Sequence, residues 1–333
     1  MANLANLANF RPIISRFAPA PTGFLHLGHI VNAVYVWGVT RAASGRVLLR
    51  IEDHDRQRSQ PVFEAAILED LAWLGFEADG PLVRQSDRGD IYSQALDRLR
   101  ERRLMYACSC TRTEIATAAQ TETVGQAFHV AQAFRPAIAG LKPRATPEMP
   151  VPVPEMRYPG TCRDRGLAEG PGIGLRVRLA PSVERFVDLR HGPQVQSPSE
   201  QCGDLLVRDR EGNWTYQFAA TVDDLEQGVT LVIRGDDLLT STGRQIQLAR
   251  LLGRVEPPGF LHHPLIMKPI PAAGGGFGAS SQKLSKSDGD TGIRELRANG
   301  WTPAQVIGRA ARLAGLSPTD DPLAADQVPS LFP

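Results

Sequence analysis

The chain has 333 residues, 42% of them hydrophobic, and its 37 basic and 36 acidic side chains leave a formal net charge of +1. This length and apolar content suffice for one large or two modest domains, while no apolar run approaches a membrane span and no signal-peptide pattern begins the chain, so we expect a cytoplasmic protein without a membrane partner. The near-zero charge excludes a globally basic nucleic-acid binder, so contact with RNA requires a local patch.

Hydrophobic periodicity predicts alternating strands and helices in the first third of the chain. The opening near-repeat, residues 1–10, is interpreted as a flexible leader. After it we expect strands at 13–17 and 46–51, and helices at 27–43, 61–74 and 90–104. This βαβ spacing is what a parallel sheet requires.

The later elements are shorter. Strands are expected near 174–179 and 186–190, in an inserted subdomain or its return, and 205–217 is typical of a hairpin that leads into a helix. Further strands are expected at 230–234 and 260–267 and a helix at 242–252. Two short helical patterns follow within 292–316.

The segment Pro21–His29, PTGFLHLGH, has the residue types of a phosphate-binding turn. His26 and His29 can donate ring N–H groups to phosphate oxygens, and Gly28 allows close approach of a nucleotide. The helix that begins near Leu27 would direct its free N–H groups at the same anion. In isolation, two histidines near a helix start are more often ordinary packing or solvated residues.

A second charged segment, KLSKS, occupies Lys283–Ser287 after a glycine-rich stretch at 271–278. Lys283 and Lys286 could bind an anion, although a Lys/Ser loop alone is usually just a solvated loop. The glycines permit closure of this loop, but a flexible linker is the plainer interpretation.

Together the two segments resemble the HIGH and KMSKS signatures of class I aminoacyl-tRNA synthetases. The resemblance implies an α/β fold with a Rossmann-like, doubly wound parallel sheet, and ATP with Mg²⁺ as reactants at the strand ends. It implies catalytic roles for His26, His29, Lys283 and Lys286. It implies an ATP site made of Pro19, Thr22, Gly23, His26, Gly28, His29 and Lys286.

Other segments resemble the glutamyl-tRNA synthetase branch of this class: 16–23 (RFAPAPTG), 50–53 (RIED), 216–219 (YQFA) with 223–224 (DD), and 234–239 (RGDDLL). Two arginines that clamp carboxylates and a glutamate that holds an ammonium would suit L-glutamate. The resemblance implies a glutamate pocket made of Arg16, Phe17, Ala18, Pro19, Ala20, Glu52, Tyr216 and Arg234. The chain departs from the family at Ala20, where the family usually has serine, so one hydroxyl contact is missing.

Three of the four cysteines, Cys108, Cys110 and Cys162, flank one long segment. In a cytosolic chain such thiols indicate a metal site or inert cysteines before disulfides, and a tetrahedral zinc needs a fourth ligand. Chemistry alone would suggest His129 or Asp164 as that ligand, and reduced cysteines without metal are the alternative. The resemblance instead implies Tyr158 as the fourth zinc ligand.

We therefore divide the chain into a leader (1–10), the first half of the catalytic core (11–107), an inserted zinc subdomain (108–200) with a proline-rich, extended loop at about 112–157, the second half of the core with KLSKS (201–291), and a short helical tail (292–333). Residues 288–333 are too few for the anticodon-binding domain of a full glutamyl-tRNA synthetase.

This truncated form resembles the glutamyl-Q tRNA(Asp) synthetases. The resemblance implies that glutamate is activated to glutamyl-adenylate and passed to queuosine in the anticodon stem-loop of tRNA(Asp), by a monomer. The alternatives are a truncated synthetase that charges a tRNA 3′ end, another nucleotidyltransferase with a HIGH motif, and a non-catalytic paralogue that binds tRNA or glutamate.

Overall fold

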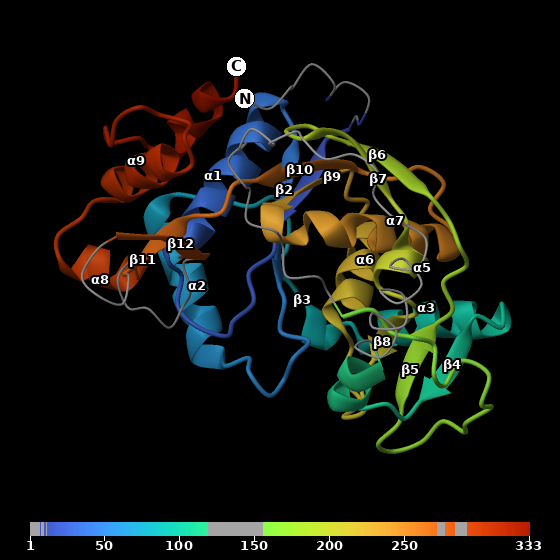
Figure 1. Ribbon diagram of the computed structural model, residues 1–333. Helices are drawn as coiled ribbons and strands as arrows, with labels where there is room; N and C mark the ends of the chain where they lie inside the picture. The colour runs from blue at the N-terminus through green and yellow to red at the C-terminus, as the bar shows by residue number, and fades with distance from the viewer. Residues whose placement is uncertain (1–6, 8–9, 11, 119–155, 272–276, 284–291) are drawn as a thin grey trace, which may run out of the picture.

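The structure is a computed structural model, and it describes residues 7, 10, 12–118, 156–271, 277–283 and 292–333. A parallel sheet assembled from both halves of the chain forms its centre (Figure 1). The backbone N–H of Thr230 donates to the carbonyl of Ile14 at 2.9 Å, which joins the strands of the first half to those of the second. Ladder pairing divides the sheet into two parts: one has the order β3 (Val83–Arg84), β2 (Arg46–Ile51), β1 (Ile14–Phe17), and the other has the order β9 (Leu231–Gly235), β10 (Gly259–His263), β6 (Glu184–Asp188), β7 (Gly192–Gln196).

Within each part the paired strands run parallel, except β7, which forms one edge as an antiparallel hairpin with β6. The strands of the sheet centre are apolar along most of their length because helices cover both faces. In β9, for example, the four residues from Leu231 to Arg234 are all buried. The expected α/β class with a parallel sheet is confirmed.

The helices follow the local signals of the sequence. Pro61 starts α2 and Gly75, with φ of 81°, ends it. The helices are α1 (Leu27–Ala42), α2 (Pro61–Leu74), α3 (Gly89–Glu101), α5 (Pro198–Gln201), α6 (Tyr216–Glu226), α7 (Thr242–Leu251), α8 (Ile293–Ala298) and α9 (Pro303–Leu313), with 3-10 turns at Gln85–Asp87, Asp236–Ser241 and Ala325–Leu331. Among the helices in these described ranges, none has both the length and the apolarity that crossing a bilayer requires.

Helix α1 is buried on nearly every side, between the sheet and the C-terminal elements α9 and Ala325–Leu331 (Figure 1). Gly38 makes this packing possible. A Cβ atom at Gly38 would lie 2.2 Å from the ring of Phe332, so a side chain here would displace that ring.

A second, antiparallel sheet lies beside the core and consists of β4 (Met105–Cys108), β5 (Gly174–Val177) and β8 (Leu205–Arg208). It carries two of the cysteines on β4 and in the loop that follows. A separate hairpin, β11 (Met267–Pro271) with β12 (Phe277–Lys283), leads to the KLSKS segment.

The structure corrects several element boundaries. The helix expected at 90–104 ends at Glu101 because Arg103 takes a left-handed conformation, with φ of 55°, and residues 105–108 then form strand β4. The strand expected at 186–190 runs from Glu184 to Asp188. The hairpin expected at 205–217 is reduced to one bridge between Arg208 and Trp214 before α6 begins.

Pairing also differs from the expected division of the chain. Strands β6 and β7 fall within the segment expected to be the insert, 108–200, yet β6 pairs with β10 of the core sheet. Strand β8 falls within the expected second half of the core, yet it pairs with β5.

Two further segments differ in their described parts. Leu7, in the expected flexible leader, is buried in the core, and Phe10 packs against the same cluster. Residues 112–118, expected to be an extended loop, are helical, since Thr111 and Glu114 form a capping box. The remainder of that loop, residues 119–155, lies outside the described residues, as does Lys286.

Candidate active site

A cavity of about 690 Å³ opens at the carboxyl ends of β1, β2, β9 and β10. Open α/β sheets bind ligands at this edge. The backbone N–H of Glu52 donates to the carbonyl of Pro19 at 3.0 Å, which fixes the first motif loop against the end of β2. The cavity is lined by Arg16, Phe17, Ala18, Pro19, Ala20, His26, Gly28, His29, Val31, Asn32, Glu52, Tyr216, Ile233, Arg234, Gly235, Asp237, Leu238, His263, Pro264, Leu265 and Ile266.

The chain on either side of the KLSKS segment approaches this cavity. Lys283 ends β12, and Gly292, beyond the segment, forms an antiparallel bridge with His26. The N–H of Ile293 donates to the carbonyl of Leu25 at 3.0 Å. The second motif therefore begins at the end of a hairpin, and the residues at 292–293 contact the backbone of the first motif.

His26 and His29 have a defined tautomer. Nδ1 of His26 accepts from the N–H of Gly28 at 3.0 Å, and Nδ1 of His29 accepts from the N–H of His26 at 3.1 Å. These two bonds form the capping box that starts α1. Because Nδ1 is the acceptor in both neutral rings, the proton is on Nε2, where it can be donated to an anion.

Arg16 and Glu52 are held by a buried pair of charges behind the cavity wall. Oδ1 of Asp224 accepts from Nε of Arg16 at 2.9 Å and from Nη1 of Arg50 at 2.8 Å, while Arg50 Nη2 lies 3.2 Å from Glu52 Oε1. Burial opposes ionisation of Asp224, but Arg16 and Arg50 outweigh it and lower its pKa to about 2.

Glu52 and Arg16, which line the pocket, are less fully compensated by their neighbours than Asp224 is. Burial raises the pKa of Glu52, and Arg50 and Arg16 oppose this only in part. A cation placed against Glu52 would relieve that penalty. Nε of Arg16 donates to Asp224, and its Nη1 donates to the carbonyl of Ile233. Within the described part of the chain, Nη2 is the group of Arg16 that remains for a ligand.

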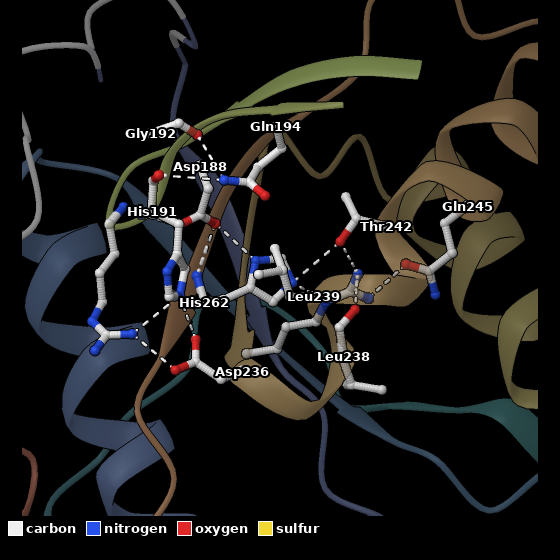
Figure 2. A network of polar contacts seen from close by, with 12 residues as sticks. Asp188, His191, Gly192, Gln194, Asp236, Leu238, Leu239, Thr242, Gln245 and His262 are labelled. Atoms are coloured by element: carbon white, nitrogen blue, oxygen red, sulfur yellow. Dashed lines mark hydrogen bonds and ion pairs between the residues drawn. The ribbon is translucent and has the colours of Figure 1, made fainter. Parts of the chain in front are cut away.

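Arg234 belongs to a separate polar network with Asp188, His262, Thr242 and Gln245, and Figure 2 shows how the last four lie. Its Nε donates to Nε2 of His262 at 3.0 Å, and Nδ1 of His262 lies 2.7 Å from Oδ2 of Asp188. Asp188 and His262 are both fully buried. Burial lowers the pKa of His262, which keeps the ring neutral, with Nδ1–H directed to the carboxylate and the Nε2 lone pair to Arg234.

The remaining protons of Arg234 are also engaged. Nη1 donates to Gln245 at 2.5 Å, and Nη2 to Thr242 at 2.9 Å and to the Leu238 carbonyl at 3.3 Å. Four of the five N–H donors of a guanidinium are thus used, and the side chain of Tyr216 hydrogen-bonds to the same guanidinium. Arg234 therefore supplies positive charge, and the bidentate clamp expected from the sequence would require it to break existing bonds.

The cysteine cluster has the geometry of a zinc site. The sulfur atoms of Cys108, Cys110 and Cys162 all lie within 4.8 Å of one another, and the hydroxyl of Tyr158 lies 3.4 Å from Cys108 Sγ and 4.0 Å from Cys110 Sγ. Ligand atoms around tetrahedral zinc are separated by about 3–4 Å. The donor set therefore fits that ion.

Arg176 adds positive charge to the same cluster. Its Nε donates to Cys108 Sγ at 3.3 Å, and its guanidinium lies 3.6 Å from the centre of the Tyr158 ring. A cation here offsets the charge of several anionic ligands.

Comparison with known proteins agrees with this geometry. Residues 12–322 match the family described as tRNA synthetases class I (E and Q), catalytic domain. The glutamyl-Q tRNA(Asp) synthetase of Bordetella bronchiseptica is 42% identical over 83% of this chain and 75% of its own length. That of Rhodobacter capsulatus is 37% identical over 91% of this chain and 100% of its own.

The chain belongs to the glutamyl-Q tRNA(Asp) synthetase family of class I synthetases. Among solved structures, the glutamate-tRNA synthetase of Elizabethkingia anophelis matches with a TM-score of 0.70 and 26% identity, over 96% of this chain and 66% of that one. The resemblance seen in the motifs is confirmed, and the chain is a ligase.

Within this glutamyl-Q tRNA(Asp) synthetase fold, most of the expected pocket residues line one cavity. These are Arg16, Phe17, Ala18, Pro19, Ala20, His26, Gly28, His29, Glu52, Tyr216 and Arg234. Thr22 and Gly23 do not line it. The side chains of Lys283 and Lys286 are outside what the structure describes.

Sequence reasoning missed several residues of the site. Asp237 and Leu238 stood in a segment quoted for its family resemblance but received no role, and His263 received none either. His262 and Asp188 support Arg234 from two different strands, so no local pattern connects them. The adjacent histidines at the end of β10 were the available signal for a polar site.

Proposed function

We propose that this chain activates L-glutamate with ATP and transfers the glutamyl group to queuosine in the anticodon stem-loop of tRNA(Asp). One observation carries the proposal: the motif histidines and the residues suited to an acidic amino acid line a single cavity in a member of the family with that name.

The glutamate site in this proposal uses charge on two sides. The Nη2 edge of Arg16 receives one carboxylate, and Arg234 adds positive charge. Glu52 holds the α-ammonium, which explains why a carboxylate is kept in a buried position. Tyr216, Phe17, Ala18, Pro19 and Ala20 complete the walls.

Activation needs pre-set positive charge around the ATP phosphates, with Mg²⁺ accompanying the nucleotide. A glutamate α-carboxylate oxygen attacks the α-phosphorus, and the bond to pyrophosphate breaks. His26 and His29 donate their Nε2 protons to phosphate oxygens beside the first turn of α1, with Gly28 allowing close approach. Pro19, Thr22 and Gly23 belong to the nucleotide side of the site, and Lys283 and Lys286 stabilise the leaving pyrophosphate.

Zinc is proposed as a structural ion held by Cys108, Cys110, Tyr158 and Cys162. When bound, it cross-links the end of β4 to the loop at 158–162. No step of the reaction is attributed to it.

Two measurements test the proposal. Glutamate-dependent ATP–pyrophosphate exchange without tRNA should occur, and Lys286→Ala should reduce its kcat by ~100-fold, the scale of one charge-stabilising group. Labelled glutamate should then enter tRNA(Asp) that contains queuosine but not tRNA(Asp) that lacks it. Folded protein without exchange would remove the activation claim.

A second candidate is charging of an ordinary tRNA 3′ end. The glutamate–tRNA ligase 2 of a Chelativorans species, 36% identical over 96% of this chain and 60% of its own length, favours it. Equal charging of tRNA with and without queuosine, lost when the 3′ end is oxidised, would support this candidate instead. The monomeric state and cytoplasmic location expected from the sequence remain part of the main proposal.

A further inference from the structure

A second cavity, of about 850 Å³, lies between the glutamate pocket and the cysteine cluster. Tyr216 lines both cavities, and Cys108 and Cys110 line the second. Trp214 provides an aromatic face there, and the charged lining consists of four arginines (Arg58, Arg112, Arg176 and Arg210) and three carboxylates (Asp55, Asp209 and Glu211). Aromatic faces and arginines are the groups that bind a nucleoside with its phosphates, and the volume suits one.

His54 stands at the junction of the two cavities. His54 lines the second cavity, and Glu52, two residues earlier in the sequence, lines the first. The ring centre of His54 is 6.4 Å from that of Tyr216, which lines both. A group bound against Glu52 and a nucleoside in the second cavity would therefore meet beside this imidazole.

The tautomer of His54 follows from its contact with Gln85, which is itself hydrogen-bonded to Asp223. Asp223 is fully buried and accepts from Nε2 of Gln85 at 2.7 Å, which turns the Gln85 carbonyl oxygen toward His54. That oxygen lies 2.5 Å from Nδ1 of His54. Because an amide oxygen only accepts, Nδ1 must carry the proton, and in the neutral imidazole the lone pair is then on Nε2.

The amide of Gln85 is itself firmly oriented. The other carboxylate oxygen of Asp223 accepts from Nε of Arg88 at 2.6 Å, and the hydroxyl of Tyr92 is 2.9 Å from Oδ2. The chain Asp223–Gln85–His54 thus fixes one ring orientation, as the third member of a catalytic triad does for its histidine.

We propose that His54 Nε2 accepts the proton of the acceptor hydroxyl during glutamyl transfer. This inference rests on the proposed function. The hydroxyl oxygen forms a bond to the glutamyl carbonyl carbon, the bond from that carbon to the AMP phosphate oxygen breaks, AMP leaves with the electron pair, and the hydroxyl proton passes to His54.

The test separates the two half-reactions. Enzyme carrying glutamyl-adenylate is mixed with a saturating anticodon stem-loop that contains queuosine, and single-turnover transfer is measured. His54→Asn keeps a donor for Gln85 but lacks the Nε2 position, so transfer should fall by ~100-fold while glutamate-dependent pyrophosphate exchange persists. His191→Asn, at a histidine that lines neither cavity, is the matched control.

A second variant distinguishes a chemical role of the imidazole from a purely structural one. In His54→Ala, added imidazole should restore part of the transfer rate, which a purely structural role would not allow. Normal transfer by His54→Asn would overturn the inference and leave the AMP phosphate as the base. A loss confined to stem-loop affinity, with a normal rate at saturation, would also overturn it. Absence of exchange in the parent protein would instead remove the proposed function.

Discussion

Nε of Arg234 donates a hydrogen bond to Nε2 of His262 at 3.0 Å, and the same imidazole reaches the buried carboxylate of Asp188 through Nδ1 (Figure 2). Strands β6, β9 and β10 each contribute one of these residues, so the sheet itself sets the direction of the arginine. Arg234 therefore enters the glutamate pocket as a fixed group.

His262→Asn should disturb this arrangement selectively. Asparagine retains a donor for Asp188 but withdraws the acceptor from Arg234. Since a hydrogen bond to a charged group is worth about 1.5–3 kcal/mol, the KM for glutamate in pyrophosphate exchange should rise ~10-fold or more, with a smaller change in kcat. An unchanged KM in a variant of normal thermal stability would show that Arg234 needs no such support.

Asp224→Asn should destabilise the whole fold. Its carboxylate is shared by Arg16 and Arg50, and Arg50 is completely buried. Removing one partner of a buried ion pair costs about 3–5 kcal/mol in the free energy of unfolding, measurable by denaturant titration. Asp97→Asn, at an exposed carboxylate paired with Arg100, is the control and should change stability little.

Stability should depend on pH through His263. Burial lowers the pKa of this histidine from 6.5 to about 4. Between these values the unfolded chain binds more protons than the folded one, so the free energy of unfolding falls as the pH drops from about 6.5 to 4, by up to ~3 kcal/mol. His263→Leu should show a shallower slope over that window, and equal slopes in the two proteins would contradict the assignment.

Zinc content should depend on the cluster and not on the fourth cysteine. Purified protein should contain roughly one zinc ion per chain, and Cys162→Ser should lose it. Cys202, whose Sγ lies 3.1 Å from the carbonyl of Pro198, is outside the cluster, so Cys202→Ser should retain the metal. Metal analysis of the three proteins is the measurement, and zinc retained in Cys162→Ser would exclude the proposed ligand set.

Ala20→Ser should strengthen glutamate binding. The variant adds the hydroxyl that the family resemblance leads us to expect at this position, and Ala20 lines the cavity. One neutral hydrogen bond contributes about 0.5–1.5 kcal/mol, which corresponds to a KM ~2- to 10-fold lower. Ala20→Gly, which adds no polar group, is the comparison, and a KM unchanged by serine would mean that the hydroxyl finds no partner here.

Local signals account for what the sequence predicted well. The expected bounds of β2 and α2 match the structure, because alternating apolar residues, a proline at a helix start and a glycine at its end act within a few residues. The motif residues around His26 were singled out in a different way, through the resemblance of two distant segments to one pair of signatures, because the spacing of the histidines alone is more often that of ordinary residues.

Long-range pairing accounts for what was missed. The strand at 105–108 depends on its partner β5 across the loop, and the arginine-rich helical pattern before it gives no stop signal until Arg103 turns left-handed. His262, Asp188 and Gln85 act only through residues distant in sequence, so their roles emerge from the folded sheet.

The packing of Phe332 against Gly38 has a consequence for biosynthesis. The ring of Phe332 lies against the middle of α1, so this helix is covered by a side chain that is synthesised far later in the chain. A nascent chain can pair β1 with β2 early, yet the apolar surface of α1 stays exposed until the segment that contains Phe332 has been made. During that interval the growing polypeptide should be prone to aggregation and should bind chaperones that recognise exposed apolar surface.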